Sequence, residues 1–164
     1  MYLVSLYFDE KTNEILNQWK DPSRDVPNHI TVASFDTDVK DIKAYFSLEG
    51  IFSSEVHFVS QGILGKDNVV IYVLLNEYLH ELSKSVHESL NRIPDVKISL
   101  KYRVWGWIPH VTMASKCTKD RIQSYFLNNI ALFHDFTGMV TKIAISKTNP
   151  YEDIVVWDLT GKET

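Results

Sequence analysis

The sequence predicts an α+β protein of two lobes with antiparallel or mixed sheet. Two observations point to this class. Segments with strand-like alternation are interspersed with segments of helical spacing, and short turn sequences join several strands as hairpins. Part of the chain also recurs about 80 residues later, an interval too long for a solenoid and suited to two related lobes. Because no low-complexity tract or linker divides the chain, we expect one bilobal domain over 1–164, with repeat units at about 29–76 and 110–160.

The elements of the first half follow from local patterns. Residues 2–8 alternate and are rich in strand formers, Pro22 and Pro27 interrupt the chain before a strand, and Gly65 opens a hairpin turn. In order, we expect a strand over 2–8, a helix over 10–19, a strand over 29–35, a helix over 38–46, and strands over 56–64 and 69–75.

The second half begins with the longest helical pattern of the chain. It places Leu79, Leu82, Val86 and Leu90 on one face and stops before Pro94. In order, we expect a helix over 77–91, strands over 97–105 and 110–116, a helix over 119–128, and strands over 140–147 and 153–159, the last two joined by a turn at 148–151.

The repeat contains a polar motif that occurs twice. Residues 29–34 have the sequence His-Ile-Thr-Val-Ala-Ser, and residues 110–115 have His-Val-Thr-Met-Ala-Ser. Lys-Asp and Tyr-Phe pairs recur downstream of both copies at offsets of 79 and 80 residues, against 81 for the histidines. Successive side chains of a strand point to opposite faces, so each histidine shares a face with its threonine while the apolar residues face a core.

Two His-x-Thr strands suit the displacement of a phosphodiester. One neutral imidazole can remove a proton while a second, protonated imidazole donates one to the leaving oxygen. Threonine hydroxyls on the same face can donate hydrogen bonds to the non-bridging phosphate oxygens. This scheme requires no metal ion, and the near-symmetry of the repeat allows either histidine to be the base.

The two motifs, the second preceded by Trp-Ile-Pro at 107–109, resemble the paired signatures of the two-histidine (2H) phosphoesterase superfamily, which includes LigT-like 2′-5′ RNA ligases and cyclic phosphodiesterases. The resemblance covers almost the whole chain. It implies a bilobal LigT-like fold with pseudo-two-fold symmetry, outer helices and a central cleft. It also implies a site without metal or cofactor that acts on 2′,3′-cyclic phosphates or on 2′-5′-linked nucleotides and RNA ends, with 2′-5′ ligation as related chemistry.

In this resemblance, His29 and His110 correspond to the acid–base pair, and Thr31 and Thr112 to the phosphate-binding hydroxyls. The chain departs from the family in one respect. Many members place Arg or Lys close to the first motif, whereas this sequence shows acidic residues there, at positions 25, 36 and 38.

Further candidates for substrate contacts are aromatic or basic. Trp105 and Trp107 can stack on a base, although alternation in a strand would put both on one face, where core packing competes with this role. Tyr151, in the last expected turn, is a further stacking candidate. Arg103 and Lys116 are candidate phosphate contacts, with simple solvent exposure as the alternative.

Composition and charge limit the classes of partner. The net charge is −4, divided into −7 for residues 1–82 and +3 for residues 83–164. This is too little positive charge to bind long duplex nucleic acid through many phosphates, but it is compatible with a small anionic substrate or an RNA end. A solvated surface with random charge asymmetry is the alternative. We expect a monomer.

The location expected from the sequence is the cytoplasm. No apolar run approaches the ~18 residues of a membrane span, the N-terminal residues lack the features of a signal peptide, and we expect no membrane contact. The single cysteine, Cys117, cannot form an internal disulfide, which fits a reducing compartment.

Three other interpretations stay open. The chain can be a hydrolase of small cyclic nucleotides or oligonucleotides, a non-catalytic module that binds a nucleotide or RNA end, or a partner-binding protein in which the motifs are relics. Retention of all four polar motif residues favours the enzyme, because a relic has no physical need of two acid–base groups and two hydroxyls in register.

Overall fold

Eight strands form one sheet in the order β1-β2-β6-β4-β3-β7-β8, with β5 paired to β2. The structure is a computed structural model that describes residues 1–129 and 132–162. Its strands are β1 (Tyr2–Phe8), β2 (Ile30–Asp36), β3 (Ser54–Leu64), β4 (Asn68–Val73), β5 (Lys97–Ile98), β6 (His110–Ala114), β7 (Phe136–Lys147) and β8 (Glu152–Asp158). Its helices are α1 (Glu10–Asn17), α2 (Glu77–Leu90) and α3 (Lys119–Asn129), with single 3₁₀ turns η1 (Ile42–Tyr45) and η2 (Leu100–Tyr102).

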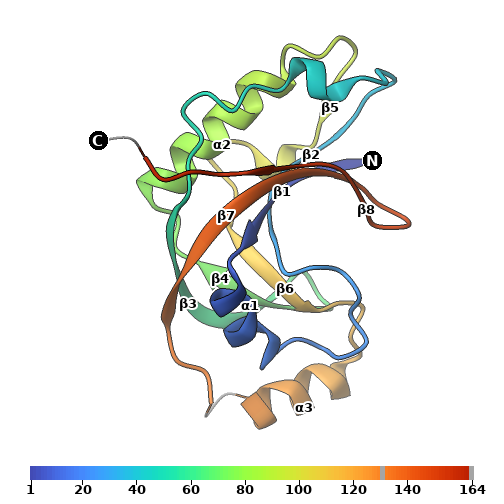
Figure 1. Cartoon of the computed structure of the whole chain (residues 1–164). Coiled ribbons are helices and arrows are strands. Elements are labelled where there is room, and N and C mark those ends of the chain that lie inside the picture. The colour runs from blue at the N-terminus through green and yellow to red at the C-terminus, as the bar shows by residue number, and fades with distance from the viewer. Residues whose placement is uncertain (130–131, 163–164) are drawn as a thin grey trace.

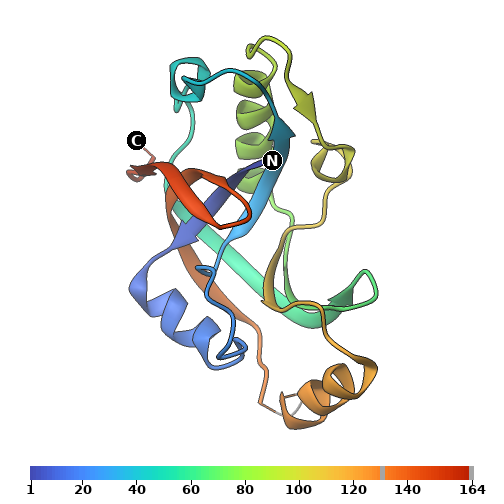
Figure 2. The same cartoon turned by 90° about the vertical axis from the view of Figure 1, so that its right-hand side faces the viewer.

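The strand order has a two-fold character. Because β1 also pairs with β7, six strands form a closed ring of pairings in the order β2-β1-β7-β3-β4-β6. On one side of the ring β2 is followed by β1 and β7, and on the other side β6 is followed by β4 and β3. The long strand β7 serves both halves, since its first part pairs with β3 and its second part with β1. Pairings between the named strands are antiparallel, which confirms the predicted α+β class with two lobes. Helix α2 lies at one end of the molecule, and α1 and α3 lie at the other (Figures 1 and 2).

The repeat units have the same order of elements but different strand partners. The first unit is β2-η1-β3-β4, and the second is β6-α3-β7-β8. Strand β4 lies beside β6, whereas β8 lies on the outer side of β7. The N-terminal strand β1 takes the place beside β2 that β4 takes beside β6.

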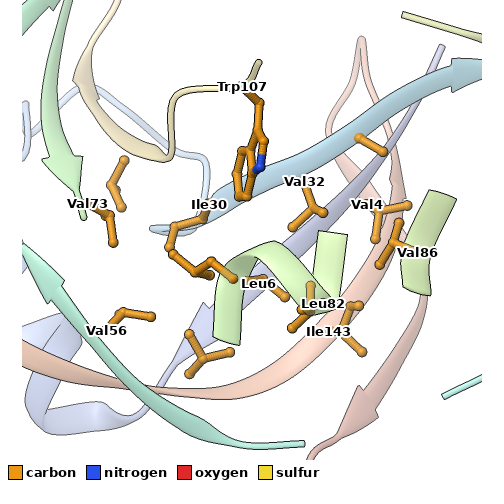
Figure 3. Close-up of a cluster of buried hydrophobic side chains, with 14 of the residues drawn as sticks. Val4, Leu6, Ile30, Val32, Val56, Val73, Leu82, Val86, Trp107 and Ile143 are labelled. Carbon is orange, nitrogen blue, oxygen red and sulfur yellow. The ribbon is translucent and has the colours of Figure 1, made fainter. Parts of the chain in front are cut away.

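One large apolar cluster supports the strands that carry the motifs. Alternate residues of β1 and β2, including Val4 and Val32, meet Leu82 and Val86 of α2 (Figure 3). Asn76 caps the start of the helix, because its side chain accepts a hydrogen bond from the Leu79 amide at 2.9 Å. Each fully buried Leu or Val stabilises the fold by about 1.5–3 kcal/mol. The cluster therefore fixes which face of β2 and β6 points away from the core.

Two predicted elements are wrong. The helix expected over 38–46 is only the 3₁₀ turn η1, because Asp95 instead holds the start of the segment through Thr37 and the Asp38 amide. A segment of nine residues is too short to form a stable helix alone. The strand expected over 97–105 ends at Ile98, and the Ser99 hydroxyl then accepts a bond from the Lys101 amide to begin η2.

Within the described residues, no helix combines the length and apolar character needed to cross a membrane.

Candidate active site

Strands β2 and β6 place the two motifs side by side. Ile30 pairs with Val111 in antiparallel register. Continued by one residue in each direction, this register puts Thr31 opposite His110 and His29 opposite Thr112. Since Ile30 and Val111 are both 0 % exposed, the four polar side chains lie on the other face of the two strands. Each histidine therefore neighbours the threonine of the other motif.

Both imidazoles are held in the same way. His29 Nδ1 lies 2.7 Å from the carbonyl oxygen of Pro27, and His110 Nδ1 lies 2.7 Å from that of Ile108. A carbonyl oxygen can only accept a hydrogen bond, so Nδ1 carries the proton in both rings and donates it. In the neutral rings Nε2 is consequently the unprotonated atom, available to take a proton from a bound group.

The environment keeps both rings neutral at pH 7. Burial, together with the charges of Arg24 and His110, lowers the pKa of His29 to about 4, against the hydrogen bond to Pro27 and the charge of Asp153. Burial also lowers the pKa of His110, against its bond to Ile108. A bound anion would raise both pKa values and favour one imidazolium.

The two threonines differ in burial. Thr31 is 8 % exposed, its partner on β1 is Ser5, and its hydroxyl lowers the pKa of the Tyr102 phenol against the opposite effect of burial. Thr112 is half-buried, and its partner on β4 is the apolar Val70. The hydroxyl of Thr112 is thus the more accessible of the two.

A hydrogen-bonded group covers His29. The ring of Tyr151 lies 5.6 Å from the imidazole, centre to centre, at 34°. The Tyr151 hydroxyl is 2.6 Å from that of Tyr7, which donates to Asp153 at 2.6 Å, and Ser146 donates to the same carboxylate at 2.6 Å. Burial and the Asp153 carboxylate raise the pKa of Tyr7, so its phenol stays protonated. Tyr151 is thereby fixed in place over the first motif histidine.

The sequence gives no local sign that Tyr7 belongs to this site. The β1–β2 register, in which Leu6 pairs with Ile30, places Tyr7 beside His29 when it is continued by one residue. Tyr72 of β4 has the matching position beside His110. Only the pairing of the strands shows that Tyr7 and Tyr72 lie beside the two motif histidines.

A cavity of about 500 Å³ adjoins the second motif. His110, Thr112, Tyr102, Lys101 and Asn68 are among its lining residues. Because His110 lines the cavity and lies opposite Thr31 in the register of β2 and β6, the cavity lies next to both motifs. Amide, phenol and ammonium groups around such a space suit a polar ligand of nucleoside size.

The two candidate tryptophans have opposite environments. Trp107 is 3 % exposed and belongs to the buried cluster, so its ring faces are covered by the core (Figure 3). Trp105 is 86 % exposed, and its ring lies 4.7 Å from that of His80, beside a separate hollow. The expectation that both share a face is wrong, because residues 103–106 form a turn, closed by the bond from the Gly106 amide to the Arg103 carbonyl, instead of a strand.

The predicted basic candidates lie outside the cavity, and a different arginine lies near the first motif. Arg103 and Lys116 are exposed and do not line the cavity at His110. Arg24 is half-buried, and its charge lowers the pKa of His29. The expectation that the first motif lacks a basic neighbour is therefore wrong. The position of Arg24, five residues before His29, was the available signal, but the loop geometry was needed to interpret it.

Within residues 1–129 and 132–162, no three His, Cys, Asp or Glu side chains gather as a set of metal ligands.

Comparison with known proteins extends to fold alone. No family model matches the chain, and no curated protein does. Among solved structures, the crystal structure of TT0787 of Thermus thermophilus is similar, with a TM-score of 0.62 and 14% sequence identity over 99% of each chain. A likeness of this extent at such low identity shows that the two chains share the same overall fold.

Proposed function

We propose that the chain is a metal-independent phosphodiesterase of the 2H type that acts on 2′,3′-cyclic phosphates or 2′-5′-linked nucleotides. One observation carries the proposal: two neighbouring imidazoles each give Nδ1–H to a backbone carbonyl and so keep Nε2 available for proton transfer. The resemblance of the motifs and the bilobal α+β fold support the same class.

The reaction needs one imidazole of each protonation state. In hydrolysis of a cyclic phosphate, the neutral ring takes a proton from water as the water oxygen bonds to phosphorus. The bond from phosphorus to the 2′ or 3′ oxygen breaks, and the protonated ring gives its proton to that oxygen. The sum is the addition of one water molecule, and the two rings exchange protonation states. Thr31 and Thr112 donate to the non-bridging oxygens, where negative charge increases.

The cavity supports a nucleotide as the substrate class. A nucleoside beside His110 would meet the Tyr102 ring together with the amide of Asn68. Its phosphate would then lie at the edge of the cavity, next to the motif residues. In ligation of RNA ends, a 5′-hydroxyl would replace water as the nucleophile: its oxygen bonds to the phosphorus of the cyclic phosphate, the bond from phosphorus to the 3′ oxygen breaks and that oxygen takes a proton, and a 2′-5′ bond remains.

A substrate panel tests the proposal. It comprises 2′,3′-cyclic mononucleotides, 2′-5′ dinucleotides, cyclic dinucleotides and oligonucleotides ending in a cyclic phosphate, each with and without EDTA. We expect turnover of at least one member in EDTA, lost in His29→Ala and His110→Ala and kept in the surface variant His57→Ala. Turnover that EDTA abolishes and a divalent ion restores would exclude the metal-independent mechanism. Tight nucleotide binding without any turnover would favour the binding module.

A further inference from the structure

Arg24 lies in the loop between α1 and β2, at the point where the two motif strands come together. Its Nη1 donates to the Ser115 hydroxyl at 3.4 Å, directly after β6. Its charge also acts on His29 and on Tyr151, which covers that ring. The guanidinium therefore connects the end of the second motif with the histidine of the first.

The loop that carries Arg24 is docked on β6. The Asp21 amide donates to the Met113 carbonyl at 3.0 Å, and the Arg24 amide donates to the Asp21 carbonyl at 3.0 Å. The Asp21 carboxylate accepts from the Ser23 amide and hydroxyl at 3.1 and 3.0 Å. These bonds fix the backbone under Arg24, so the position of its side chain is a property of the fold.

This guanidinium has no carboxylate partner in the described part of the chain. The nearby carboxylate of Asp21 forms its ion pair with Arg121 instead. Burial lowers the pKa of Arg24, which expresses the cost of holding this cation partly out of water. A single 3.4 Å bond to an exposed serine does little to offset that cost. An unpaired, half-buried cation that ends at Ser115 after β6 and acts on the neutral imidazole of His29 is a place for an anion.

We propose that Arg24 binds the phosphate group of the substrate, as the positive contact that the motifs themselves do not contain. The inference rests on the proposed function for the identity of the ligand, a phosphodiester or phosphomonoester anion. The planar guanidinium can donate two parallel hydrogen bonds to phosphate oxygens. A charged donor adds to the stabilisation that the Thr31 and Thr112 hydroxyls would give a developing dianion.

The test compares Arg24→Gln and Arg24→Met with the control Arg92→Gln, an exposed arginine after α2. Calorimetric titrations with 2′-AMP, 3′-AMP, inorganic phosphate and adenosine measure affinity without turnover. We expect the Arg24 variants to bind the phosphate-containing ligands at least tenfold more weakly and adenosine unchanged, with partial recovery in Arg24→Lys. The His29 pKa, followed by NMR, should rise in both neutral variants because a positive charge is removed.

The outcomes separate this inference from the proposed function. It is overturned if a folded neutral variant binds 2′-AMP and 3′-AMP as tightly as the wild type, if adenosine affinity falls equally, or if the wild type binds neither nucleotide. If the wild type turns over a panel substrate and Arg24→Gln does so equally fast, the inference about Arg24 is overturned and the proposed enzymatic function stands. If nucleotide binding depends on Arg24 but no panel substrate is turned over, the phosphate-binding role of Arg24 stands and the proposed enzymatic function is overturned.

Discussion

Acid should destabilise the fold through His29. Burial lowers the pKa of the folded residue to about 4, whereas its ordinary value is 6.5. Between these two pH values the unfolded chain binds a proton at His29 that the folded chain does not, so protons favour unfolding. This group leaves the free energy of unfolding unchanged above about pH 6.5 and decreases it as the pH falls towards 4. The difference between the folded and the ordinary pKa of His29 corresponds to about 3 kcal/mol of unfolding free energy, at roughly 1.4 kcal/mol for each pH unit.

The perturbation that isolates this effect is His29→Gln, which puts a non-titrating polar side chain in the same place. Urea unfolding of both proteins at several pH values from 7.5 to 4 gives the free energy of unfolding for each. We expect the wild type to lose about 3 kcal/mol more than the variant over this range. An NMR titration of the imidazole measures the pKa directly.

Two results would refute the reasoning. If the pKa of His29 is 6.5 or above in the folded protein, burial does not remove the ring from water as the proposed pKa shift requires. If both proteins lose the same stability in acid, His29 is not a source of the pH dependence, and other groups must be responsible.

The remaining predictions concern the motifs and their support. His29→Ala and His110→Ala should each lower kcat by ~10²–10⁴ and stay folded at pH 7.5, because both rings face away from the core; wild-type kcat in either variant contradicts a role in proton transfer. Thr112→Val should lower kcat on the order of 10²-fold by removing a donor to the developing charge, and equal losses of kcat and adenosine affinity would indicate a disturbed cavity instead. Gly62→Ala should destabilise the fold by about 1–3 kcal/mol, since its Cβ would come 2.1 Å from the Tyr72 ring; an unchanged urea midpoint would mean that the ring moves aside freely.

Much of the fold was predictable because its signals are local. Alternation identified β1 and β2, and the apolar spacing before Pro94 identified α2 within a residue of its observed end at Leu90. The face that each motif residue occupies followed from the same alternation, which any strand imposes on neighbouring side chains. The failures lie at 38–46 and 97–105, where tertiary contacts of Asp95 and the small number of partners for β5 decided the conformation.

The candidate site was predictable only in its motif residues. Repetition within the sequence singled out the two histidines and two threonines before any strand pairing was known. Strand alternation, by contrast, placed Trp105 and Trp107 on one face, whereas the fold exposes the first and buries the second. Burial at a turn depends on which element packs over it, and the sequence around the turn does not specify that element.

By itself, then, the sequence determined the strands, the longest helix, and the polar face of both motifs, since these depend on residues close together in the chain. The tertiary structure decided what surrounds the imidazoles. Tyr7 meets Tyr151 across 144 residues, and Arg24 meets Ser115 across 91. Contacts at such separations exist only after β1, β2, β6 and β7 have paired, because strand register and loop docking set them and no local pattern encodes either.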